Sequence, residues 1–92
     1  MLTAVMLIKT ERTRTIAVGE ALADMEGTSE VYTVAGRYDL VAMVRVPRNE
    51  DLADLVTGRV AELEGIRATE TLMAFRTYSR HDLESLFAVG LG

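Results

Sequence analysis

The amino-acid sequence predicts an α+β fold in one domain, residues 1–92. The chain is long enough for a single core, 49% of its residues are hydrophobic, and it has one proline. Strand-like apolar runs alternate with segments whose apolar residues recur at helical spacing. The sequence shows no internal repeat, low-complexity tract or linker that would divide it. We therefore expect one mixed sheet-and-helix domain.

The first half of the chain predicts a strand, a helix and a second strand. Leu2–Lys9 is a β-like run. In the helix that follows, Thr13 or Thr15 is the expected N-cap and Gly27 the expected stop. The second strand is expected at Val31–Ala35.

The second half repeats this pattern. A third strand, Leu40–Val46, is ended by Pro47, which cannot donate to a sheet ladder. Asn49 is the expected N-cap of a second helix that stops at Gly65, and Ile66–Tyr78 contains the fourth strand. The order β-α-β-β-α-β is that of the ferredoxin-like fold, with both helices on one face of an antiparallel sheet.

The second face of this sheet is unexpectedly apolar. Val5 and Leu7 lie opposite the other apolar residues of the first strand, and Val41 and Met43 do the same in the third. An apolar sheet face of this size is rarely left in water. We expect a second copy to cover it in a dimeric α+β barrel, the alternative being that the last ten residues fold back over it.

The C-terminal residues predict one more short helix. Ser79 and Asp82 have the spacing of a capping box, and Leu83, Leu86 and Phe87 follow as a short apolar stripe. The final residues are too apolar for a solvated end. The sequence predicts that they dock, and a neighbouring subunit is one place for them.

The loop Gly36–Asp39 is the expected ligand site. Gly36 permits a positive φ and a close backbone approach, and Tyr38 offers a flat surface with one hydroxyl. Asp39 suits either a local cap or a cationic group of a ligand. From the residues alone, an ordinary turn is the favoured explanation of Gly36.

Several classes of function are disfavoured by composition. The net charge is −4, the basic residues are spread along the chain, and no helix-turn-helix or RNA-binding pattern appears, so direct nucleic-acid binding is not expected. The absence of cysteine suits the cytoplasm, and Met1–Ile8 predicts a strand, not a signal peptide or membrane span. His81 is the only histidine and has no evident partners. We therefore expect no catalytic residue, no metal site and no cofactor.

Two segments resemble a known family. Val31–Val41 resembles the central signature of the Lrp/AsnC effector-binding domain, also called the RAM domain, and Leu63–Thr71 resembles its entrance to the last strand. The resemblance spans about Leu2 to Tyr78. Members usually carry an N-terminal DNA-binding helix-turn-helix, a pattern that this sequence lacks, so it resembles the stand-alone form.

The resemblance implies a dimer of face-to-face sheets, assembling further into a tetramer or octamer. It also implies a small effector, typically an amino acid, in clefts between dimers. The loop after the second strand would hold the effector's backbone groups, and residues of the adjoining dimer would help to read its side chain. Carried over to this sequence, the effector-binding positions are Gly36, Arg37, Tyr38, Asp39, Leu40, Thr69 and Thr71.

Arg37 departs from the family pattern, in which this position is often acidic or small. Its guanidinium suits a bidentate bond to a carboxylate, or else pairs with Asp39 and obstructs the site.

We interpret the sequence as a non-enzymatic, amino-acid-binding oligomer related to Lrp/AsnC regulators. Such a module would modulate transcription or metabolism without binding DNA itself, for instance by co-assembly with a full-length regulator. The alternative is a small dimeric α+β barrel enzyme of the cofactor-free oxygenase or isomerase type, which needs a polar or titratable residue between sheet and helices. A third interpretation is a structural oligomer whose ligand site has decayed.

Overall fold

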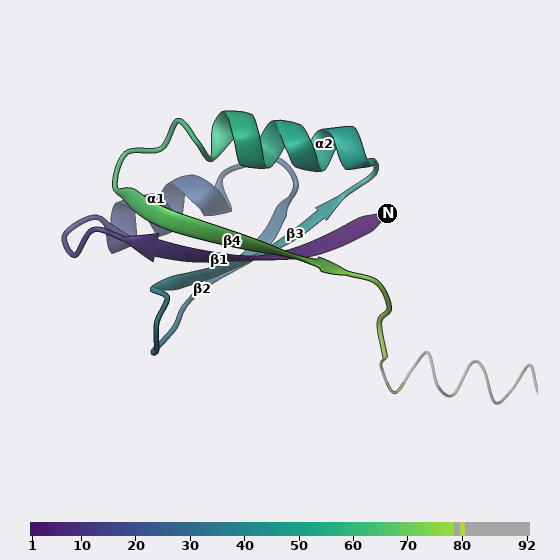
Figure 1. Ribbon diagram of the computed structural model, residues 1–92, viewed down its shortest axis with the longest axis horizontal. Coiled ribbons are helices and arrows are strands. Elements are labelled where there is room, and N and C mark those ends of the chain that lie inside the picture. Colours follow the sequence, from purple (N-terminus) through teal and green to yellow (C-terminus); the bar gives the residue numbers. More distant parts are fainter. Residues whose placement is uncertain (79, 81–92) are drawn as a thin grey trace, which may run out of the picture.

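The computed structural model describes residues 1–78 and 80 and confirms the β-α-β-β-α-β order (Figure 1). A short π-helical segment, η1, continues the second helix without a break in the chain direction. The elements are β1 (Leu2–Thr10), α1 (Thr15–Ala23), β2 (Thr28–Thr33), β3 (Leu40–Val46), α2 (Asn49–Asp54), η1 (Leu55–Arg59) and β4 (Ile66–Ala74).

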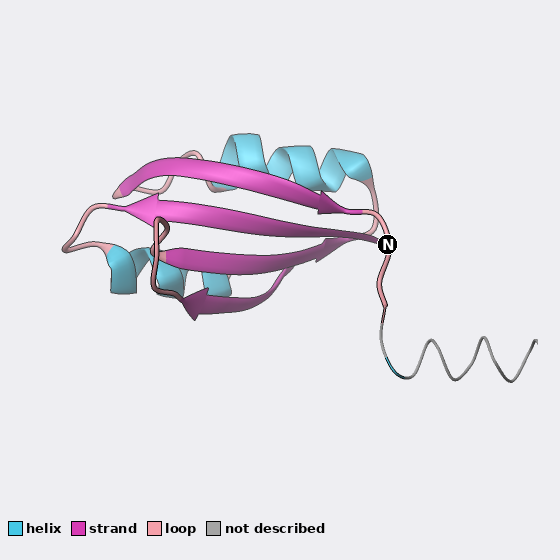
Figure 2. Ribbon diagram, turned by 60° about the horizontal axis from the view of Figure 1, so that its bottom comes forward, coloured by secondary structure: helices cyan, strands magenta, loops and turns pink. Residues whose placement is uncertain are grey.

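The four strands form one antiparallel sheet in the order β2-β3-β1-β4. The two central strands, β3 and β1, are paired over their length, so that Leu2 lies opposite Val46 and Ile8 opposite Leu40. Both helices pack on the same face of the sheet, as Figure 2 shows from the other side. This arrangement confirms the ferredoxin-like fold and leaves one sheet face without helices.

The core lies between the helices and the sheet. Every second residue of β1 and β3 is buried there, as the period of two along a strand requires. The helices contribute apolar residues at helical spacing. The buried apolar side chains are Ala4, Met6, Ile8, Val18, Leu22, Leu40, Ala42, Val44, Val46, Leu52, Leu55 and Val60.

The sheet face opposite the helices, the open face, is apolar along its middle. Residues directly opposite each other in an antiparallel pair point to the same face, so the register assigns its members. At one edge Leu72 is 46% exposed and at the other Tyr32 is 48% exposed. No helix or strand in the part of the chain that the structure describes covers this face. Its central apolar residues are Val5, Leu7, Val41, Met43 and Leu72.

The second strand was predicted at Val31–Ala35 and lies earlier, at Thr28–Thr33. Gly27, with φ +97°, turns the chain straight from α1 into β2, and Thr28 already pairs with Val44. The predicted end was wrong because the chain leaves the sheet at Val34, although the Val34 amide still donates to the Asp39 carbonyl at 3.0 Å.

Both expected helix caps are displaced by one residue. Thr15 is the first residue of α1, and its hydroxyl bonds the hydroxyl of Thr10 at 2.7 Å instead of capping the helix. Asn49 is the first residue of α2, and Arg48 occupies the cap position, where its amide donates to Asp51 Oδ2 at 3.2 Å. At α1 the threonine hydroxyl thus bonds the end of β1, whereas at α2 a capping box forms one residue earlier than expected.

The predicted C-terminal helix and apolar tail fall on residues 79 and 81–92, outside the described residues. None of the helices in the described part of the chain has the length and apolar character needed to cross a membrane.

Candidate functional site

The loop between β2 and β3 projects from the open face and is tied to the end of β1 (Figure 2). The Asp39 amide donates to the Ile8 carbonyl at 2.9 Å, which fixes the loop beside β1. Gly36 has φ +125°, so the turn requires glycine on conformational grounds. A Cβ built on Gly36 would meet nothing within 4 Å, so no neighbouring atom in the described structure requires a glycine there.

Asp39 is held in place through one of its two carboxylate oxygens. Its Oδ2 accepts a hydrogen bond from the Thr10 amide at 2.8 Å, and the Thr10 hydroxyl lies 3.5 Å from the same oxygen. Thr10 is itself buried, and its hydroxyl is hydrogen-bonded to the hydroxyl of Thr15. Among the described residues, Asp39 Oδ1 has no hydrogen-bond donor. The Asp39 carboxylate is therefore fixed by a long-range hydrogen bond to the end of β1 and retains one acceptor oxygen.

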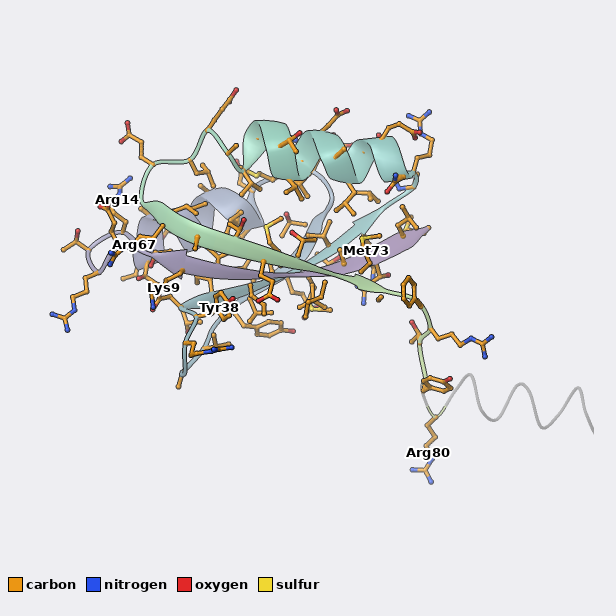
Figure 3. All side chains as sticks on the ribbon, in the orientation of Figure 1. Lys9, Arg14, Tyr38, Arg67, Met73 and Arg80 are labelled. Atoms are coloured by element: carbon orange, nitrogen blue, oxygen red, sulfur yellow. The ribbon has the colours of Figure 1, made fainter. Side chains whose placement is uncertain are left out.

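Tyr38 reaches from the loop across the open face to β4. Its hydroxyl donates to Glu70 Oε2 at 2.6 Å (Figure 3 labels Tyr38). Glu70 lies opposite Leu7, which places the pair on the open face. This hydrogen bond raises the pKa of the Tyr38 phenol above its usual value, because ionising the phenol would place a second negative charge beside the carboxylate.

Arg37 makes no ion pair with Asp39 in the part of the chain that the structure describes. Its carbonyl accepts a hydrogen bond from Lys9 Nζ at 3.2 Å, and its side chain is exposed. The expected obstruction of the site by an Arg37–Asp39 pair is therefore not seen in this structure.

The remaining expected site residues do not converge on the loop within one chain. Thr69 and Thr71 share a sheet face, as expected, but they lie opposite Ile8 and Met6 and so face the helix side. The Leu40 side chain is 1% exposed and belongs to the core, which leaves only its backbone for a ligand.

A pocket of about 560 Å³ opens beside Asp39, between the loop and the turn that follows β1. The sequence interpretation missed its three cationic residues, Lys9, Arg12 and Arg67. The signal was weak, because Arg67 is far from the others along the chain and reaches them only because Lys9 pairs with Ala68. Figure 3 shows Lys9 and Arg67 at the same end of the sheet. The lining residues are Lys9, Thr10, Glu11, Arg12, Asp39 and Arg67.

The buried space between sheet and helices is lined mainly by apolar side chains. Among residues 1–78 and 80, the buried set contains Thr10 as a polar residue but no titratable side chain. Over the same residues, no three His, Cys, Asp or Glu side chains are grouped so that they would hold a metal ion. The feature that would favour the alternative enzyme interpretation is therefore not found there.

The loop Gly36–Asp39 and the polar pocket beside it are the candidate ligand site of this small α+β domain. The sequence pattern of the Lrp/AsnC ligand binding domain matches residues 3–83, and the chain belongs to this family.

Three known proteins illustrate the similarity. TTHA0845 from Thermus thermophilus is 50% identical in sequence with a TM-score of 0.83, over 87% of this chain and 100% of that one. An uncharacterized HTH-type transcriptional regulator of Pyrococcus horikoshii is 35% identical over 60 residues, which are 65% of this chain but only 40% of the regulator. A transcriptional regulator of Neisseria meningitidis, solved in complex with L-Met, shares the fold with a TM-score of 0.73 at 8% identity, over 86% of this chain and 53% of that one.

Proposed function

We propose that this protein is a non-enzymatic oligomer that binds an amino acid as effector and modulates transcription or metabolism. The proposal rests mainly on the fixed position of the Asp39 carboxylate. One oxygen of its carboxylate is fixed by Thr10, the other has no donor among the described residues, and Asp39 lines a pocket of about 560 Å³. A fixed carboxylate oxygen suits the ammonium group that every free amino acid carries.

The family supports the choice of ligand class. The matched domain is a ligand binding domain, and the Neisseria meningitidis regulator of the same fold was solved with an amino acid, L-Met. On this proposal the loop residues Gly36, Arg37 and Tyr38 surround the effector's backbone groups, while Asp39 holds its ammonium.

The open face supports an oligomer. Its apolar middle would be buried if two sheets packed face to face, and homodimers would then assemble into a tetramer or octamer. The effector would lie in clefts between dimers. Thr69 and Thr71 face the helix side of their own sheet, whereas the loop projects from the open face, so on this proposal another subunit would bring its threonines to the effector.

On this proposal the module affects transcription through a partner protein, a full-length regulator. The match covers 40% of the Pyrococcus horikoshii protein, which is named as an HTH-type transcriptional regulator, and the helix-turn-helix is a DNA-binding motif. We propose that this module acts in the cytoplasm without binding DNA or a membrane itself, and co-assembles with a full-length regulator. An effector held between dimers would stabilise that assembly by mass action.

A panel of the twenty amino acids tests the proposal. We expect at least one to raise the melting temperature and to change the assembly size, because the ligand binds only the folded oligomer. Asp39→Asn keeps an acceptor for the Thr10 amide but removes the charge, and should abolish the shift. Asp54→Asn, at an exposed position on α2, should leave it intact. If none of the twenty amino acids changed the melting temperature or the assembly size, the proposal would be contradicted.

A further inference from the structure

We propose that the effector is an amino acid with an acidic side chain, whose second carboxylate is bound by Lys9, Arg12 and Arg67. This inference rests on the proposed function and adds the class of ligand that the pocket beside Asp39 selects. The three cations come from different elements: Lys9 from the end of β1, Arg12 from the turn before α1, and Arg67 from the start of β4.

These cations are not neutralised within the described structure. Arg12 and Arg67 make no ion pair or hydrogen bond with any described residue. Lys9 gives one of its three N–H donors to the Arg37 carbonyl and keeps two. The carboxylates in the lining are Glu11 and Asp39, and Asp39 already accepts from Thr10. Three cations therefore face two carboxylates in this pocket.

The charges of the pocket complement those of an acidic amino acid. Such a ligand carries one ammonium for Asp39 and two carboxylates for the cations, which leaves a net charge opposite to that of the lining. A neutral amino acid has a single carboxylate and would leave more of the positive charge unmatched. Planar guanidinium groups are also the side chains that bind carboxylates with two parallel hydrogen bonds.

The positive pocket is a local feature of an acidic protein. The chain has 14 acidic and 10 basic residues, so its overall field does not attract anions. Glu11 and Asp39 interrupt the cluster, which does not form the continuous basic stripe that a nucleic-acid backbone requires. A small anion that also carries an ammonium group fits this alternation.

Calorimetric titration with matched ligand pairs tests the inference. Glutamate and glutamine have the same shape and differ in the charge of one group, as do aspartate and asparagine. We expect one acidic ligand to bind at least about tenfold more tightly than its amide, the size of one charge-assisted hydrogen bond. Arg12→Gln and Arg67→Gln should each reduce that ratio. Arg76→Gln replaces an exposed arginine outside the pocket and should leave the ratio unchanged.

The possible results separate this inference from the proposed function. If glutamine and asparagine bind as tightly as their acids, and Asp39→Asn abolishes all binding, the inference is overturned while the amino-acid sensor stands. If succinate or inorganic phosphate binds as tightly as glutamate, the pocket is a general anion site and the inference is also overturned. If no amino acid of any charge binds, both proposals fall.

Discussion

Asp39 has a structural role in the loop, and on our proposal the same side chain also binds the ligand. Its Oδ2 joins the loop to β1 through the Thr10 amide, and that bond orients the whole carboxylate. Because Thr10 is buried and held by Thr15, the oxygen that remains has a defined position before any ligand arrives. A preoriented acceptor reduces the ordering cost of binding.

The Tyr38–Glu70 hydrogen bond predicts that stability depends on pH. The hydrogen bond raises the pKa of Tyr38 in the folded protein. Its contribution to the stability of the folded state is therefore fully present below the phenol's ordinary pKa and is lost as the pH rises through the raised pKa. Glu70→Ala should return the pKa of Tyr38 towards 10.0, measured by phenolate absorbance. Glu64→Ala, at an exposed position before β4, is the control. An unchanged titration in Glu70→Ala would show that the pair does not form.

Part of the candidate site could be proposed from the sequence at this scale. The glycine, tyrosine and aspartate of the loop stand together in the sequence between two strands, so local turn chemistry pointed to them as candidates. Lys9, Arg12 and Arg67 were missed because only strand register brings them together. The side of the sheet that Thr69 and Thr71 face also depends on register, which the sequence does not state directly.

At the scale of elements, a glycine inside a helical segment and a glycine just before a strand have different roles. Gly58 lies in η1, and a Cβ built on it meets nothing within 4 Å. Gly65 precedes β4 with φ +94°, and its Cβ would lie 2.5 Å from the Cβ of Arg14. Gly58 is therefore replaceable, whereas Gly65 is required by its backbone and by its neighbour.

Alanine substitutions test this contrast by chemical denaturation. Gly58→Ala should raise the free energy of unfolding by about 0.5–1 kcal/mol, because alanine loses less backbone entropy in a helix. Gly65→Ala should lower it by about 1–3 kcal/mol through backbone strain, with the Arg14 contact adding to the loss. The account of both positions is wrong if the two variants change stability in the same direction.

The elements themselves were largely predictable, and their ends were not. Apolar periodicity located four strands and two helices because tertiary packing follows that pattern. The expected N-caps were wrong by one residue: the Thr15 hydroxyl hydrogen-bonds the hydroxyl of Thr10, and the Arg48 amide, not that of Asn49, donates to Asp51 Oδ2. The predicted start of β2 was wrong because polar residues from Thr28 onward pair with β3, with a register shift between Thr28 and Glu30, where the sequence predicts no strand.

At the scale of the whole molecule, the open face determines what the domain can become. Two helices cover one side of the sheet, and no described helix or strand covers the apolar middle of the other side, which on our proposal packs against a second copy. Packing two such faces together buries both at once and leaves the loops at the rim, where a second dimer can reach them. The ligand site and the assembly are then linked through the same sheet.

A charge on the open face tests the dimer. Leu72 is 46% exposed in the single chain, so Leu72→Glu should fold but dissociate the oligomer by placing a carboxylate in its interface. Ile16→Glu changes a residue that is 76% exposed on α1, on the helix side, and should leave the oligomer intact. Sedimentation equilibrium at micromolar concentration measures both. A wild-type monomer under these conditions would contradict the dimer.

The most direct test of the central claim is a calorimetric titration of the wild-type protein with whichever amino acid gives the largest thermal shift, repeated on Asp39→Asn. We predict saturable binding to the wild type and none to the variant, whose melting temperature without ligand stays close to that of the wild type. Equal binding by the two proteins would contradict the assignment of the effector site to Asp39.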